Sequence, residues 1–172
     1  MQEKLDNYLV EKYPKIFINR YKGPMESCLY FGFEHNDGWF WLLDQLCESI
    51  QGYIDNNNKY SSEDKQISQV IASQVKEKFG GLNFYYSGGD NYIDGMVSMV
   101  EHMSYNICEF CGSTENVGRT SGWIYTICKD CYATSDKRVS SLKWKEHEDK
   151  KTEICKELRK IKLDKIKQHG YE

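Results

Sequence analysis

The sequence predicts an α+β protein: a small sheet covered by helices, followed by a zinc ribbon and a long C-terminal helix. Three observations support this fold class. Apolar residues recur at helical spacing over 38–55 and 91–105, and two β-rich runs at 70–79 and 82–87 flank a glycine pair. Two Cys-x-x-Cys pairs, separated by sixteen residues, follow. We therefore divide the 172 residues into an α+β body (1–105), a zinc ribbon (106–133) and a charged helical tail (134–172).

The first half of the body predicts a helix, a strand and a second helix. Residues 2–13 have amphipathic spacing, and Tyr13-Pro14 is expected to end that helix. Residues 28–34 are predicted to form a strand. Asp37 is a typical helix N-cap, so we expect a helix from 38 to about 55 that stops at the three asparagines 56–58.

The second half of the body predicts a hairpin and a third helix. Gly80-Gly81 suits a two-residue turn, because glycine tolerates the positive φ angles of tight hairpin turns. A second glycine-rich turn, 87–89, precedes Asp90, which is expected to cap the helix over 91–105.

The tail predicts one long helix over 135–168, with Ser135 as its cap. Its apolar stripe is thin and comprises Ile154, Leu158 and Ile161. A thin stripe on a charged helix is typical of a partner seam or a lightly docked arm. We therefore expect a homo-oligomer that forms through this helix, or a binding arm.

The strongest chemical signal is the set of four cysteines, Cys108, Cys111, Cys128 and Cys131. Two Cys-x-x-Cys knuckles at this spacing can surround one tetrahedral Zn²⁺. Such a closed site has no open coordination position, so it holds structure without doing chemistry itself. Two interpretations stay open: a ribbon that binds a macromolecule, or a structural staple under a small domain.

Composition and charge narrow the function classes. No run of eighteen apolar residues exists, and the first residues lack a basic region followed by an apolar stretch, so we expect neither a membrane span nor a secretory signal. Reduced metal-binding cysteines fit a cytoplasmic protein. Residues 1–128 hold 10 Lys and Arg against 17 Asp and Glu, whereas residues 129–172 hold 13 against 9. The acidic body argues against broad nucleic-acid binding, and the basic tail leaves a weaker form of it open.

Ligand-binding candidates gather on the predicted hairpin and near the ribbon. Lys76 and Lys78 lie on one face of the hairpin, beside an aromatic run that precedes Ser87 and its two glycines. Backbone amides there could hold a phosphate, and Arg119 lies beside Trp123 in the ribbon tip. The full set is Trp39, Lys76, Lys78, Tyr85, Tyr86, Ser87, Arg119 and Trp123. The alternative interpretation is that the aromatics are core and the glycines simple turns.

Evidence for catalysis is sparse. The sequence contains no P-loop, no G-x-G-x-x-G and no H-E-x-x-H motif. His35 with Asp37 is the one acid–base pair that the sequence suggests, although Asp37 also fits a helix cap. An enzyme is therefore the minority interpretation.

Several segments together resemble a group of small uncharacterised proteins of phages and prophages. The segments are QVKEKFGGL from Gln74, MSYNICEFCG from Met103 and GWIYTIC from Gly122, within a resemblance over about 8–132. Members of that group often end the second knuckle with histidine, where this chain has Cys131. The resemblance implies an accessory protein in the host bacterial cytoplasm, and a counter-defence role fits it: sequestering a small nucleotide-type signal of the host. The alternatives are a zinc-ribbon adaptor that binds nucleic acid or a host protein and, second, a nucleotide hydrolase.

Overall fold

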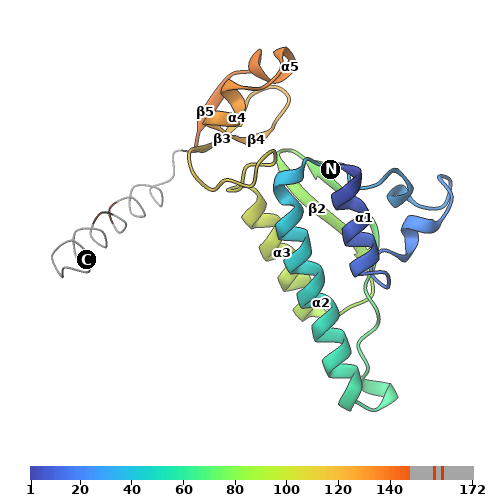
Figure 1. Ribbon diagram of the computed structural model, residues 1–172. Coiled ribbons are helices and arrows are strands. Elements are labelled where there is room, and N and C mark those ends of the chain that lie inside the picture. The colour runs from blue at the N-terminus through green and yellow to red at the C-terminus, as the bar shows by residue number, and fades with distance from the viewer. Residues whose placement is uncertain (148–156, 158–159, 161–172) are drawn as a thin grey trace, which may run out of the picture.

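The computed structural model describes residues 1–147 together with residues 157 and 160 (Figure 1). Helices α2 (Phe40–Tyr60) and α3 (Asn91–Ser104) run antiparallel and pack beside the hairpin of β1 (Ile71–Lys78) and β2 (Gly81–Ser87). Helix α1 (Glu3–Lys12) lies next to them. The predicted α+β class is confirmed for this body.

Helix α1 matches its prediction, but the strand expected over 28–34 is wrong. The hydroxyl of Ser27 accepts a hydrogen bond from Leu29 N, which starts a 3₁₀ turn, η2 (Cys28–Phe31), after an earlier turn η1 (Ile18–Tyr21). Gly32, with φ of 83°, ends η2. Only Glu34 joins the sheet, through one parallel bridge to Lys76. A serine cap therefore outweighs the β-rich composition of this segment.

Helix α2 begins two residues later than predicted, and Asp37 does not cap it. A 3₁₀ turn, η3 (Asp37–Trp39), precedes the helix. The Asp37 carboxylate instead accepts a hydrogen bond from Gln2 N at 2.7 Å and so ties the start of α1 to η3.

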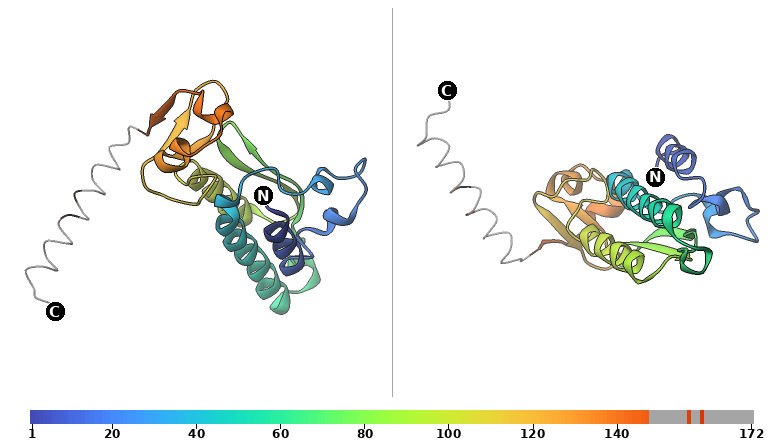
Figure 2. Two further views of the ribbon diagram at one scale, coloured as in Figure 1. Left: turned by 45° about the horizontal axis from the view of Figure 1, so that its top comes forward. Right: turned by 90° about the horizontal axis from the view of Figure 1, so that it is seen from below.

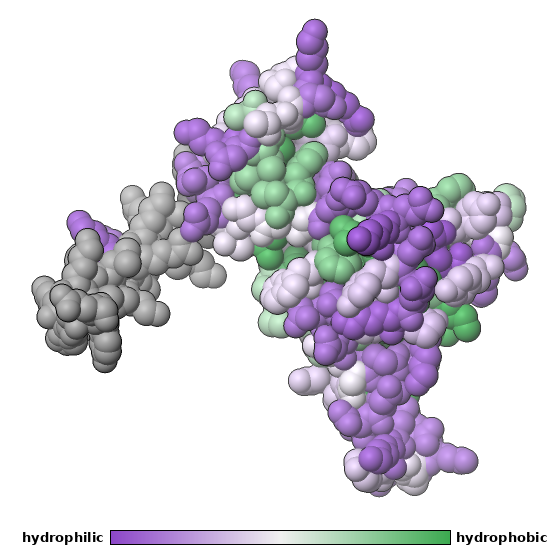
Figure 3. Space-filling view, in the orientation of Figure 1, coloured by the Kyte–Doolittle hydropathy of each residue, from purple (hydrophilic) through white to green (hydrophobic). Residues whose placement is uncertain are grey.

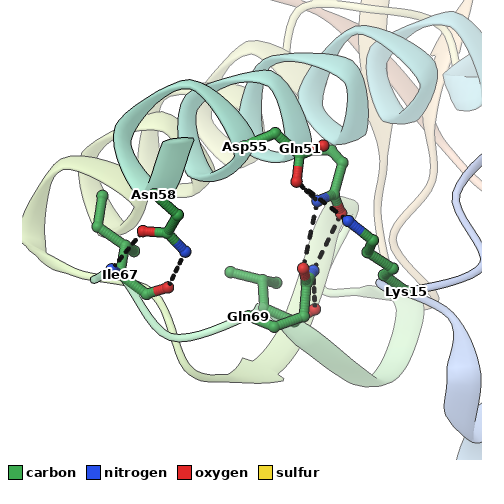
Figure 4. Close-up of polar contacts among 7 residues, drawn as sticks. Lys15, Gln51, Asp55, Asn58, Ile67 and Gln69 are labelled. Carbon is green, nitrogen blue, oxygen red and sulfur yellow. Dashed lines mark hydrogen bonds and ion pairs between the residues drawn. The ribbon is translucent and has the colours of Figure 1, made fainter. Parts of the chain in front are cut away.

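The three asparagines do not stop α2, which continues to Tyr60. Figure 4 shows the reason: the side-chain amide of Asn58 bonds both backbone groups of Ile67, at 2.7 Å and 2.8 Å. Gln51 and Gln69 exchange a second pair of hydrogen bonds about two turns earlier in α2. These bonds hold the returning chain, which includes η4 (Glu63–Lys65), against the helix. Figure 3 shows that this projecting end is mostly hydrophilic.

The predicted hairpin is confirmed, with its turn shifted by one residue. Lys78 pairs with Gly81, so the turn residues are Phe79 and Gly80, with φ of 54° and 79°. Gly81 pairs with Lys78 and therefore belongs to β2. A Cβ there would lie 2.5 Å from the ring of Tyr105, which is why the position needs glycine. The predicted cap of α3 is confirmed, because the Asp90 carboxylate accepts hydrogen bonds from the backbone N–H groups of Tyr92 and Ile93.

Residues 107–147 form a second, smaller unit, which we call the cysteine module. It contains β3 (Val117–Thr120), β4 (Thr126–Cys128), α4 (Lys129–Ala133), α5 (Lys137–Ser140) and β5 (Trp144–Glu146). Its sheet has the order β4-β3-β5, and all pairs are antiparallel. Figure 2 shows the module at one end of the body.

The long helix predicted from Ser135 is wrong over residues 135–147. Asp136, and not Ser135, caps the short α5, because its carboxylate accepts from the N–H groups of Arg138 and Val139. The chain then turns into β5, where Trp144 stacks on Tyr132 and donates to Ile127 O at 3.0 Å. The predicted stripe of Ile154, Leu158 and Ile161 lies outside the described residues.

The body and the cysteine module each have a hydrophobic core. The larger core joins α1, α2, α3 and the hairpin, with Trp39, Phe17 and Leu43 among its fully buried side chains. The smaller core lies in the cysteine module and contains Cys108 and Cys128. Within the described part of the chain, no helix is long and apolar enough to cross a membrane.

Candidate metal centre and the adjacent groove

The four predicted cysteines meet in the cysteine module. The sulfur atoms of Cys108, Cys111, Cys128 and Cys131 all lie within 4.8 Å of one another, and those of Cys111 and Cys128 are 3.7 Å apart. Cys108 and Cys128 are buried, and Cys111 is exposed. The four cysteines are therefore placed to hold one metal ion.

Each knuckle has a local cause. In the first, Gly112 has a φ of 78° and donates its N–H to Cys108 O at 2.8 Å, which closes the turn around Cys111. In the second, Cys128 is the N-cap of α4, and its sulfur accepts a hydrogen bond from Cys131 N. The Cys-x-x-Cys spacing thus places two sulfurs on the same side of each turn.

The donor set fits a structural zinc ion. Burial raises the pKa of the Cys108 thiol to about 11, so without a cation this cysteine stays protonated at neutral pH. A bound cation offsets that cost, because the thiolate is the form that binds metal. Four sulfurs leave no open coordination position, which is typical of sites that stabilise a fold.

The first knuckle is anchored directly to the body. Gly38 N donates to Glu109 O at 2.8 Å, and the indole N–H of Trp39 donates to Ile107 O at 3.0 Å. An ideal Cβ on Gly38 would lie 2.2 Å from Cys108 O, so the backbone of η3 and the knuckle are in close contact. Only glycine fits at this crossing.

Glu109, between the two cysteines of the first knuckle, is a buried carboxyl that sequence analysis missed. Its side chain is 2 % exposed, and burial raises its pKa to about 7. Asn36 donates two hydrogen bonds to Oε1, from its backbone N–H and its side-chain amide, whereas buried Oε2 has no described partner. A glutamate after a metal-binding cysteine gives no sequence signal for burial.

A groove of about 500 Å³ separates β1 from the loop between β3 and β4. It brings together three of the predicted ligand residues: Lys76, Lys78 and Trp123. The other lining residues, which sequence analysis did not select, are Glu34, Glu77, Phe79, Gly122 and Ile124. The KEKF run and the Gly-Trp pair were the only sequence signals for this site.

The groove combines cations with exposed rings. Trp123 is 58 % exposed, and the guanidinium of Arg138 lies 5.6 Å from the centre of its ring. The ammonium of Lys78 lies 5.7 Å from the ring centre of Phe79, which is also exposed. Among the described residues, neither Lys76 nor Lys78 takes part in an ion pair.

Arg119, on β3, is not among the residues that line the groove, but it contacts Phe79, which is. Its guanidinium donates to Phe79 O and lies 5.1 Å from the ring centre of Tyr105. This placement makes Arg119 a link between the module and the hairpin turn.

The remaining predicted ligand residues lie elsewhere. Trp39 is 0 % exposed, so its ring contacts the core and not the groove. Tyr85 is exposed two positions along β2 from the partner of Lys76, and Tyr86 donates to Asp94. Of the amides expected to hold a phosphate after Ser87, that of Gly89 is already engaged, because it donates to Ser68 O at 2.9 Å.

The two members of the suggested acid–base pair bond to different backbone groups. His35 is 5 % exposed, its Nδ1 bonds Asn36 O, and its Nε2 has no described partner. Burial lowers the pKa of His35 to about 4, so the ring is neutral at physiological pH. Asp37 accepts from Gln2 N, as described above.

No protein-family model, curated protein or solved structure matches this chain. The fold and the site therefore define only a class of protein: an α+β protein with four cysteines placed to hold one metal ion. The predicted relation to phage and prophage proteins stays a prediction.

Proposed function

We propose that this protein binds a nucleotide-type ligand in the groove and that a structural zinc ion holds the cysteine module. The observation that carries the proposal is the meeting of Lys76, Lys78 and Trp123 around one groove. Lysine ammonium groups recognise phosphate, and an exposed indole offers a face on which a base stacks. A nucleotide carries both groups.

The surrounding charge favours a small ligand over a long polyanion. Residues 1–128 hold seven more acidic than basic residues, and Glu34 and Glu77 line the groove itself. A long nucleic acid would extend beyond the groove over the acidic body, whereas a mononucleotide or dinucleotide would contact only the residues of the groove. The carboxylates of Glu34 and Glu77 also provide acceptors for the amino or hydroxyl groups of a nucleotide.

The use we propose is stoichiometric sequestration of a nucleotide signal, without turnover. The suggested catalytic pair supports this, because His35 is buried and its Nδ1 bonds Asn36 O. A counter-defence role in an infected bacterial cell is the context that the resemblance to phage proteins implies.

The test is a binding panel on the zinc-loaded protein, with mononucleotides, cyclic dinucleotides and a single-stranded oligonucleotide measured by titration calorimetry. Trp123→Ala is expected to weaken binding by roughly 5- to 150-fold, the range that corresponds to about 1–3 kcal/mol per stacked base. Trp41→Ala is the matched control, because Trp41 on α2 is 60 % exposed and lies outside the groove.

Two outcomes would contradict the proposal. If no nucleotide binds, or if Trp41→Ala and Trp123→Ala weaken binding equally, the groove is not the site. Tighter binding to the oligonucleotide, with affinity that falls steeply with salt, would favour the adaptor alternative. Chromatography of the recovered ligand checks turnover, since a hydrolase would return a shorter product.

A further inference from the structure

The hairpin turn and the cysteine module are in direct contact. The hydroxyl of Thr126, which is fully buried at the start of β4, donates to Gly80 O at 2.5 Å. Arg119 of β3 donates to Phe79 O, the adjacent carbonyl. An ideal Cβ on Gly80 would lie only 2.7 Å from the side chain of Ile124. The turn therefore fits closely against β3, β4 and the loop between them.

The two walls of the groove come from these two parts of the molecule. Lys76, Lys78 and Phe79 belong to the hairpin, whereas Gly122, Trp123 and Ile124 belong to the loop between β3 and β4. The groove consequently depends on the position of that loop. Its shape is set by the contacts of Thr126 and Arg119 with the hairpin turn.

The metal site lies at the other end of the same short strand. β4 runs from Thr126, which holds the hairpin turn, to Cys128, which belongs to the four-cysteine cluster. The buried core of the module consists of Cys108, Val117, Ile127, Cys128 and Val139, so two of its five buried members are metal-binding cysteines. So small a core depends on its ion for stability.

We propose that metal binding at the four cysteines and ligand binding in the groove are thermodynamically coupled, so that the groove is competent only in the metal-loaded protein. This inference rests on the proposed function for its ligand. Linkage makes the coupling reciprocal: the factor by which metal raises ligand affinity is the factor by which ligand raises metal affinity. Couplings of this kind are typically about 5- to 150-fold, and we expect at least about tenfold here.

The experiment uses the full chain in zinc-loaded and chelator-treated forms. Hydrogen exchange is measured over residues 76–80 and 121–126, and TNP-ATP, a fluorescent nucleotide, is titrated into both forms. Zinc removal is expected to speed exchange in both segments while the buried residues of α2 keep their protection. The dissociation constant for TNP-ATP should rise at least about tenfold. Saturating TNP-ATP should raise the zinc affinity by the same factor, measured by equilibrium competition with a chelator.

A variant separates the coupling from the metal site. Thr126→Val keeps the shape of the side chain and all four cysteines but removes the donor to Gly80 O. The variant is expected to retain one zinc ion per chain, with faster exchange over residues 76–80 and a ratio of loaded to metal-free affinity that falls toward one. Thr134→Val is the matched control, because Thr134 lies in the same module and its hydroxyl bonds only within its own turn, to Asp130 O and Cys131 O.

The outcomes distinguish this inference from the proposed function. Absence of binding of TNP-ATP and of every nucleotide in the panel to the zinc-loaded protein would overturn the proposed function and this inference with it. Equal affinity in the loaded and metal-free forms would overturn the coupling alone. Unchanged exchange over residues 76–80 on zinc removal would also overturn it, whatever the ligand.

Discussion

Replacing Gly38 by alanine tests the close contact between the body and the first knuckle. The added Cβ would lie 2.2 Å from Cys108 O, 2.5 Å from Gly112 N and 2.6 Å from Glu109 O. All three are backbone atoms, so no side-chain rotation can relieve the overlap. The knuckle must move away from η3 by about 1 Å before these contacts become ordinary.

The cost follows from the overlap and from the bonds that such a movement breaks. Forced overpacking costs about 1–3 kcal/mol. The hydrogen bonds from Gly38 N to Glu109 O and from Trp39 to Ile107 O also lengthen, and each buried group that loses its partner costs about 1–3 kcal/mol. We expect a total of about 3–9 kcal/mol, a large part of the roughly 5–15 kcal/mol that stabilises a domain.

The measurement is urea unfolding of the zinc-loaded protein, followed by helical circular dichroism and by zinc release to a chromogenic chelator. Gly38→Ala should lower the midpoint by more than about 1 M, given a denaturant slope of about 1–3 kcal/mol per M. Gly52→Ala is the matched control: no atom lies within 4 Å of an added Cβ there, so replacing this glycine in α2 should stabilise the protein by about 0.5–1 kcal/mol. A Gly38→Ala protein with the wild-type midpoint and zinc retention would contradict a close contact between η3 and the first knuckle.

Three further predictions concern the metal and two buried titratable groups. Cys108→Ser should leave the purified protein without zinc in native mass spectrometry and unfold the cysteine module, whereas Cys28→Ser, at an exposed cysteine outside the cluster, should keep the ion. Glu109 has its pKa raised to about 7, so the unfolded chain ionises first and the wild-type protein loses stability as pH rises from about 4.5 to 7. Glu109→Gln should remove that loss, so the free energy of unfolding of the variant relative to the wild type should rise by up to about 3 kcal/mol between pH 5 and pH 8. The same difference between variant and wild type at both pH values would contradict the prediction. His35 has its pKa lowered to about 4, so the unfolded chain protonates first and the protein loses stability as pH falls from about 6.5 to 4. His35→Gln should reduce this loss, measured as the free energy of unfolding against pH, by up to about 3 kcal/mol. An unchanged slope would count against burial as the cause of the low pKa.

Groups near His35 also shift its pKa. The amino terminus at Met1 lowers the pKa of this histidine, whereas Asn36 O, Asp37 and Asp6 raise it. None of these effects outweighs burial, which is the largest cause. Because zinc is also released in acid, the metal content is measured at each pH, and only samples with one ion per chain are compared.

The features that were predicted correctly from the amino-acid sequence depend on local interactions. Each Cys-x-x-Cys turn forms as predicted because it is closed by bonds within five residues, such as Gly112 N to Cys108 O. Asp90 caps α3 because the donors lie two and three residues away, and the hairpin forms around a two-residue turn. The interactions that determine these features lie within a few residues of sequence, so periodicity, spacing and residue type are enough to predict them.

Elements and surfaces whose contact partners are distant in the chain depend on tertiary contacts. α2 passes its asparagines because Asn58 finds both its partners at Ile67, and the chain after Ser140 becomes β5 because β3 offers it an edge. The groove unites Lys78 with Trp123, 45 positions apart in the sequence, and no local pattern records that pairing. Burial and long-range hydrogen bonds outweigh local propensity at these places, because a packed contact or a satisfied buried polar group is worth more than the few tenths of a kcal/mol that separate local conformations.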